Sequence, residues 1–145
     1  MCVEEMYLRD VDLASVPVEH LASLASCVTG WIRIWNVSNI DLVKILDSSN
    51  CEWLRLSNQN LSTVETQAVV RAMANVEKMS FGFGGEVPLD ISALVTYGGQ
   101  GKCRSVRFEN DSMAAMYRED IQRWAKRISW SVTRDNNDKI SIERK

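Results

Sequence analysis

Apolar and polar residues follow one recurring pattern along most of this chain. The pattern is clearest from Cys51 to Leu61, which reads CEWLRLSNQNL. Apolar or small side chains occupy positions 1, 4, 6 and 11 of this frame, and an amide occupies position 9. Frames that start at residues 3, 29, 51, 76 and 103 fit the same pattern, and a degenerate sixth strand follows at Trp130 and Val132. A segment of this length cannot bury its own apolar face, so we expect each copy to stack on its neighbours.

Each copy predicts a short strand, a turn and a helical return. Inward and outward side chains alternate with a period of two in each expected strand, at 6–9, 31–35, 53–57, 78–82, 105–109 and 129–133. Helical periodicity follows at 17–25, 41–46, 62–73, 89–94 and 113–127. Pro17 suits a first helical turn, and Val18, Leu21, Leu24 and Ala25 are spaced for one buried face. The chain is therefore expected to alternate strands and helices.

Local signals mark where several of these helices begin and end. Ser62 and Thr63 are hydroxyl N-cap residues, with acidic or amide residues three positions later. Asp111 is expected to cap the last helix rather than to act in catalysis. Gly98, Gly99 and Gly101 are expected to end the fourth helix, because glycine tolerates left-handed backbone angles. This glycine stretch does not match a phosphate-binding loop, and no strand leads into it.

The C-terminal segment predicts a β-hairpin at 129–145. Trp130 and Val132 form its first strand, residues 135–138 its turn, and Ile140 and Ile142 its second strand. We expect the second strand to run antiparallel and to close the final edge of the sheet with charged residues. The hairpin would then cap a single domain at 1–145.

Composition narrows the classes of function. The 145 residues carry a net charge of −2 and contain no apolar run near membrane-span length, so we expect neither nucleic-acid nor membrane binding. The N-terminus lacks the pattern of a signal peptide, and whether repeats precede Met1 stays open. The four cysteines form no C-x-x-C pair, which argues against a metal site or cofactor. Buried free thiols would fit a reducing, cytoplasmic location.

Residues 51–74 resemble a leucine-rich repeat of the ribonuclease-inhibitor type, the type that also forms the C-terminal sensing regions of nucleotide-binding immune receptors. The resemblance implies an α/β solenoid of about five to six βα repeats, with a parallel sheet on the concave face and helices on the convex face. It also implies a role in binding a protein, in recognition or sensing. The chain departs from the family at the asparagine position, which holds Val11, Val37, Gln59, Gly84 and Asp111. Frame intervals of 22 to 27 residues also predict irregular curvature.

The outward strand positions of the first three copies predict a partner-binding patch. Adjacent strands lie about 4.8 Å apart, so side chains at equivalent positions become neighbours. Tryptophan, tyrosine and arginine are enriched at binding hot spots. A basic, aromatic patch on a slightly acidic chain favours an acidic protein partner, whereas the second half of the face is expected to be small and polar. The predicted patch consists of Tyr7, Arg9, Trp31, Arg33, Trp35, Trp53 and Arg55.

Other interpretations stay open at this stage. Trp31 and Trp53 could pack over the sheet edge with arginines stacked on them and serve only the fold. The patch, or the open N-terminal edge, could pair with a second copy of the chain. The strands could instead belong to a compact α/β domain with a small-molecule or enzymatic role. We expect no catalysis, because the single histidine, His20, lies on a helix rather than beside a nucleophile elbow.

Overall fold

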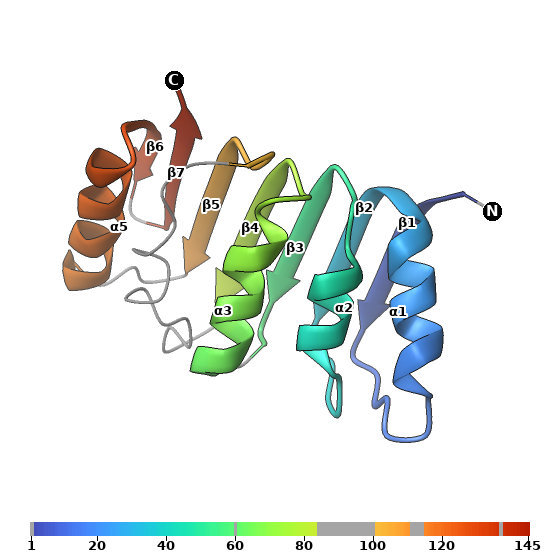
Figure 1. Cartoon of the computed structure of the whole chain (residues 1–145). Helices are drawn as coiled ribbons and strands as arrows, with labels where there is room; N and C mark the ends of the chain where they lie inside the picture. Colours follow the sequence, from blue (N-terminus) through green and yellow to red (C-terminus); the bar gives the residue numbers. More distant parts are fainter. Residues whose placement is uncertain (1, 60, 84–100, 111–114, 137) are drawn as a thin grey trace.

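The chain folds into a mostly parallel, seven-stranded sheet with its described helices on one face (Figure 1). The computed structural model describes residues 2–59, 61–83, 101–110, 115–136 and 138–145. The predicted α/β class is therefore confirmed. The elements are β1 (Val3–Arg9), α1 (Val18–Cys27), β2 (Val28–Trp35), α2 (Leu42–Ser48), β3 (Trp53–Ser57), α3 (Thr63–Ala72), β4 (Lys78–Phe83), β5 (Ser105–Asn110), α5 (Ala115–Arg127), β6 (Trp130–Asn136) and β7 (Lys139–Arg144).

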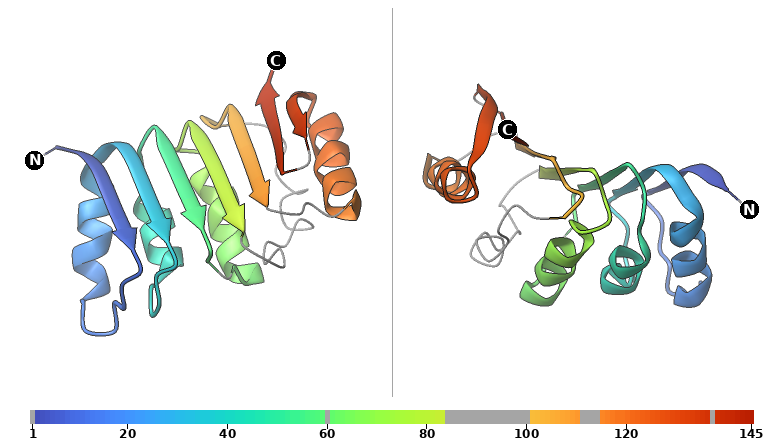
Figure 2. Two further views of the ribbon diagram at one scale, coloured as in Figure 1. Left: turned by 180° about the vertical axis from the view of Figure 1, so that it is seen from behind. Right: turned by 45° about the horizontal axis from the view of Figure 1, so that its top comes forward.

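The first five strands lie side by side in chain order. Each of β1 to β4 pairs in parallel with the next strand, while β7 pairs antiparallel with β5 and β6 antiparallel with β7. Figure 2 shows this sheet from behind, with α1, α2 and α3 beyond it. The five predicted parallel strands and the C-terminal hairpin are thus present. The sheet order is β1-β2-β3-β4-β5-β7-β6.

Two expectations for the C-terminal end were wrong. The sixth copy does not continue the parallel array, because β7 rather than β6 lies beside β5. The final edge strand is consequently β6, and Val132, expected to point inward, is 41% exposed. The physical reason is the apolar spacing of β7. Its Ile140 and Ile142 are opposite Phe108 and Val106, where they extend the core by two buried side chains.

The core consists of apolar rows that cross the sheet beneath the helices. Frame positions 4 and 6 place their side chains in register on this face, and β7 continues both rows. Helices supply the other half of the core, including Leu21, Ile45, Val69 and Trp124. Leu24, expected on the buried face of the first helix, is instead 42% exposed. The rows are Met6-Ile32-Leu54-Met79-Val106-Ile142 and Leu8-Ile34-Leu56-Phe81-Phe108-Ile140.

Helix starts follow the predicted capping chemistry. The Ser62 hydroxyl oxygen accepts a hydrogen bond from the Glu65 N–H at 3.4 Å, as the sequence predicts. The Asp41 carboxylate accepts from the Lys44 N–H at 3.1 Å and caps α2 in the same way. The predictions at residues 84–100 and 111–114 lie outside the described residues. These are the helix at 89–94, the glycines at 98–99 and the cap at Asp111; the described Gly101 has a φ of +94°.

A repeated turn follows each of the first three strands. Asp10, Asn36 and Asn58, all at position 8 of the frame, adopt left-handed φ angles of 52°, 51° and 51°. Each donates its backbone N–H to a carbonyl at or next to the end of the next strand, on Trp35, Ser57 and Gly82, at 2.9 to 3.0 Å. Asn and Asp tolerate this conformation better than most residues. Three consecutive copies therefore share one backbone geometry at their strand ends.

The amide at position 9 joins two neighbouring copies. The buried Gln59 accepts from the Val37 N–H at 2.5 Å and donates to the Val37 carbonyl at 3.0 Å. Both backbone groups of the buried Val37 are satisfied by this one side chain. Val37 occupies the same frame position as Gln59 but has no amide side chain. The hydrogen bonds of Gln59 therefore join two neighbouring repeats, and no side-chain amide of Val37 continues them to the repeat before. This agrees with the expectation that a continuous amide ladder cannot form.

The cysteines behave as the frame predicts. Cys51 and Cys103, both at position 1, are fully buried, and all four cysteines of the chain are free. Burial raises the pKa of the Cys103 thiol to about 11 and also raises the pKa of Cys51. Both thiols are thus neutral at physiological pH and pack as small apolar groups.

Candidate partner-binding face

The sheet face opposite the helices carries all seven residues of the predicted patch. Figure 2 shows this face uncovered by any described helix, and we call it the open face. The outward positions align strand by strand, as the sequence frame predicts for β1 to β5. Beyond β5 the rows continue into β7. The three rows are Glu5-Trp31-Trp53-Lys78-Ser105-Glu143, Tyr7-Arg33-Arg55-Ser80-Arg107-Ser141 and Arg9-Trp35-Ser57-Gly82-Glu109-Lys139.

The aromatic side chains of the open face form a cluster over β1, β2 and β3. The rings of Trp31 and Trp53 lie 4.5 Å apart at 41°, and the Trp53 indole N–H donates to the Ser80 hydroxyl at 2.9 Å. Tyr7 and Trp31 are the most accessible of the patch's aromatic rings, at 42% and 38% exposure. Trp35 and Trp53 are half-buried. The ring surface available to a partner is therefore concentrated on the first two strands.

Cations of the same chain cover several of these rings. Arg9 lies 4.3 Å from the ring centre of Trp35, Arg33 lies 4.8 Å from that of Tyr7, and Lys78 lies 5.6 Å from that of Trp53. These distances allow cation–π attraction, which holds both groups in place. The stacking that the sequence allowed, with arginines on Trp31 and Trp53, is present in part: Arg33 lies 5.9 Å from the ring centre of Trp31, whereas Arg55 pairs with Glu109. This stacking also preorganises the patch, because fewer rotamers are lost when a partner binds.

A charge cluster in the middle of the open face was missed by the sequence argument. Arg55 donates to the Glu109 carboxylate at 3.0 Å, while Arg107 and Lys139 nitrogens lie 3.9 and 3.8 Å from its other oxygen. Three cations thus surround one carboxylate. The sequence frame places Arg107 and Glu109 at outward positions of the fifth copy, but it does not predict their contact with each other or with Arg55. Lys139 could not be placed, because it enters on the antiparallel β7.

These neighbours control the ionisation of Glu109. Burial alone would raise the pKa of this carboxyl. The hydrogen bond and charge of Arg55, with the charges of Lys139 and Arg107, outweigh burial and hold the pKa of Glu109 below its ordinary value of 4.5. The carboxylate consequently stays ionised at neutral pH.

We expect Glu109→Gln to lower the free energy of unfolding by about 1 kcal/mol at pH 7, because it removes a half-buried, charge-assisted bond. A depressed folded-state pKa stabilises the fold above the unfolded-state pKa, near 4.5. That stabilisation is lost as pH falls through the lower folded-state value. Urea unfolding of both proteins from pH 7 to pH 3 checks this. If the difference in free energy of unfolding between the two proteins stayed constant over this pH range, the prediction would be wrong.

The open face is basic although the whole chain carries a net charge of −2. Its carboxylates are Glu5, Glu109 and Glu143, and its cations outnumber them. The half that we expected to be small and polar holds Lys78, Arg107 and Lys139, so that expectation was wrong. The cations in its three rows are Arg9, Arg33, Arg55, Lys78, Arg107 and Lys139.

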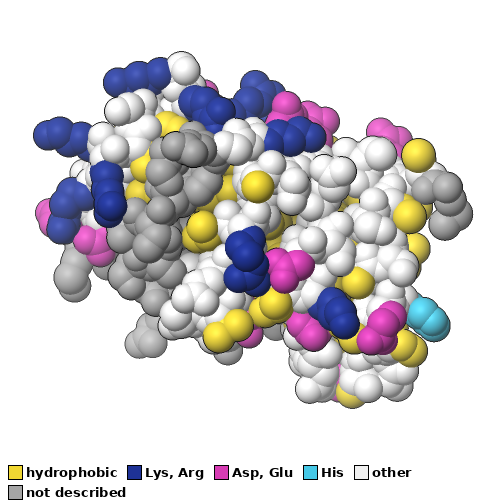
Figure 3. Space-filling model, in the orientation of Figure 1, with side chains coloured by type: hydrophobic (Ala, Val, Ile, Leu, Met, Phe, Trp, Pro, Cys, Tyr) yellow, Lys and Arg dark blue, Asp and Glu magenta, His cyan; other side chains and the backbone are white. Residues whose placement is uncertain are grey.

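Arg33 is loosely paired on this face. Its Nε is buried without a hydrogen-bond partner among the described residues, and its Nη1 lies 4.0 Å from the Glu5 carboxylate. Because the side chain is 35% exposed, the guanidinium can still donate to a carboxylate on a ligand. The helix side differs: Figure 3 shows basic and acidic side chains interspersed there. Arg71 pairs with Asp47 at 3.1 Å on that side, for example.

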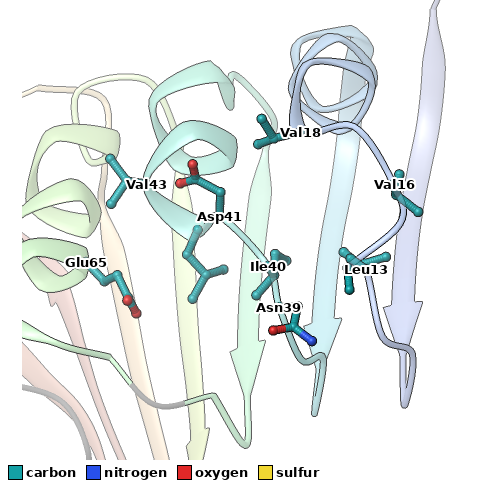
Figure 4. Close-up of a pocket in the computed structure, with 10 residues that line it drawn as sticks. Leu13, Val16, Val18, Asn39, Ile40, Asp41, Val43 and Glu65 are labelled. Carbon is teal, nitrogen blue, oxygen red and sulfur yellow. The ribbon is translucent and has the colours of Figure 1, made fainter.

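A groove of about 670 Å³ lies at the ends of β1 and β2, beside the starts of α1 and α2 (Figure 4). Leu13, Val16 and Ile40 give it an apolar lining. Two of its polar groups also serve the fold, since Asp41 caps α2 and Asn39 donates to Asp12 at 2.8 Å. The described lining contains no Ser, Cys, His or Lys side chain. The carboxylates of Asp41 and Glu65 also line the groove.

Comparisons with protein-family models, curated proteins and solved structures found no match for this chain. Support for the candidate site therefore comes from the geometry of the open face. Among the described residues, no helix is both long and apolar enough to cross a bilayer. In the same part of the chain, no three His, Cys, Asp or Glu side chains gather to hold a metal ion.

Proposed function

We propose that this chain is a short leucine-rich-repeat-like solenoid that binds an acidic segment of a protein partner through its open face. The observation that carries the proposal is the register of the predicted patch: aromatic and arginine side chains from β1, β2 and β3 stand side by side on a sheet face with no described helix over it. Such residue types combine large contact area with hydrogen-bond donors. In this proposal the role is recognition, in the cytoplasm, without catalysis.

The repeat character is supported by the strand ends. Asp10, Asn36 and Asn58 share one frame position, one left-handed backbone angle and one hydrogen bond to the next strand. Chance βα units in an ordinary twisted sheet would not need to repeat this geometry. Quasi-identical units that contact only their neighbours are the property that defines solenoids.

Charge selects the class of partner. The cations of the open face, among them the loosely paired Arg33, favour a ligand with carboxylate acceptors. A nucleic-acid strand fits less well than an acidic peptide, because a strand also needs uncovered aromatic rings on which its bases can stack. Base stacking is restricted, since Arg9, Arg33 and Lys78 already lie on the rings of the patch. An acidic peptide segment is the better match.

We expect Trp53→Ala with Arg55→Ala to abolish partner capture from native lysate while the circular dichroism spectrum stays close to wild type. The pair removes the ring beside Trp31 and the donor to Glu109. Tyr7→Ala with Trp31→Ala is the companion variant, because these rings are more exposed and cost less stability to remove. Mass spectrometry of the captured proteins is the readout.

Arg71→Ala is the matched control, since Arg71 is an exposed, ion-paired arginine on the helix side. It should capture the same protein as wild type. Glu109→Gln should have the opposite effect and increase partner capture. Without the Glu109 charge, the three cations around residue 109 should bind an acidic partner more tightly. Equal capture by all variants would refute binding through the open face.

A further inference from the structure

The β1 edge has a neighbour on one side only among the described residues. The Asp10 N–H donates to the Trp35 carbonyl, so it points toward β2. Backbone groups of successive strand residues point to alternate sides, so Leu8 and Met6 also face β2. Glu5, Tyr7 and Arg9 therefore direct their N–H and C=O groups to the open edge. An unpaired row of this kind is a template for pairing with another strand.

We propose that β1 pairs antiparallel with β1 of a second copy of this chain, about a two-fold axis at Tyr7. In this register Tyr7 is opposite its own copy, and Glu5 is opposite Arg9 of the second copy on both sides of the axis. These are the residues with edge-facing backbone groups, so each such pair exchanges two hydrogen bonds. The inference is independent of the acidic partner proposed above.

Charge selects this register among the symmetric alternatives. Shifting the axis to Met6 or to Leu8 keeps the backbone groups paired but leaves Glu5 and Arg9 without opposite charges across the edge. Pairs of opposite charge directly across two strands are stabilising, and like pairs are destabilising. The pairing ends at Arg9, because Asp10 adopts a left-handed φ of 52° and leaves the strand.

The helix-side face of β1 supports the same register. Met6 is 9% exposed and Leu8 is half-buried against the core cluster. With the axis at Tyr7, Met6 is opposite Leu8 of the second copy, and Leu8 is opposite its Met6. The apolar rows of the two cores would then meet without a polar residue between them. The two open faces would also join into one surface, with both aromatic clusters next to the axis.

Charge-swap variants test this contact, with molecular mass followed by analytical ultracentrifugation over a dilution series. Wild type should dimerise. Glu5→Arg alone should be monomeric, because two arginines then face each other across the edge. Arg9→Glu alone should also be monomeric, through opposed glutamates. The double variant E5R/R9E restores both opposite-charge pairs and should dimerise again.

A mixture of the two single variants is the most specific test of the charge pairs. One copy then carries arginine at both positions and the other carries glutamate at both, so a heterodimer should form where neither protein self-associates. Circular dichroism confirms that each variant is folded. A wild type that is monomeric at every concentration overturns the proposal. A dimer that persists in both single variants overturns it too, and assigns association to another surface.

Discussion

Phe81→Ala should remove most of the fold's stability, with an expected loss of about 3–5 kcal/mol in the free energy of unfolding. Phe81 lies in β4, the middle strand of the seven-stranded sheet, is 1% exposed and stacks on Phe108 at 5.5 Å between ring centres. Removing the ring leaves a cavity between Leu56 and Phe108, its row neighbours. Thermal and urea unfolding followed by circular dichroism measure the loss.

Val64→Ala is the matched control for this truncation. Val64 is also apolar, but it lies on α3 and is 60% exposed. A change below about 0.5 kcal/mol is expected, because little apolar area is returned to water. If both variants lost similar stability, the row through Phe81 would not form the core described above.

Gln59→Leu should cost about 2–4 kcal/mol, because it leaves the Val37 N–H and C=O buried without partners. The side chain keeps its approximate size, so the loss reports the two hydrogen bonds rather than a cavity. Backbone amide exchange of Val37 offers a local readout and should accelerate more than exchange in β4. Gln67→Leu on α3, where the glutamine is exposed, should change stability by less than about 0.5 kcal/mol. Unchanged exchange at Val37 would show that Gln59 does not secure this turn.

The parallel part of the sheet was predictable because each strand repeats the same inward spacing. Once Met6, Ile32 and Leu54 are aligned, the outward Tyr7, Arg33 and Arg55 must also align. The alternation of faces with period two then fixes the outward row, because a slip of one residue would turn every side chain to the other face. The position of the patch on the sheet could therefore be predicted without knowing any side-chain contact.

Other features depend on tertiary pairing that a linear pattern does not encode. The inward spacing of Trp130 and Val132 resembles one more repeat, yet an antiparallel hairpin satisfies the same spacing with the strand order reversed. The sequence therefore did not predict that Lys139 would lie 3.8 Å from Glu109. The left-handed turns could have been found, since Asp10, Asn36 and Asn58 are equivalent residues of a type that tolerates this backbone.

The order of strands at the C-terminal end also constrains how the chain can assemble. Strands β1 to β5 each find their neighbour in the order of synthesis, so this part can form progressively as the ribosome releases it. β6 is made before β7, yet among the described strands only β7 pairs with it. Until residues 139–144 emerge, β6 has no strand to pair with and the far edge of β5 stays unpaired. The nascent chain thus passes through a stage in which β5 and β6 both present unpaired edges, when premature contacts with other chains are most damaging.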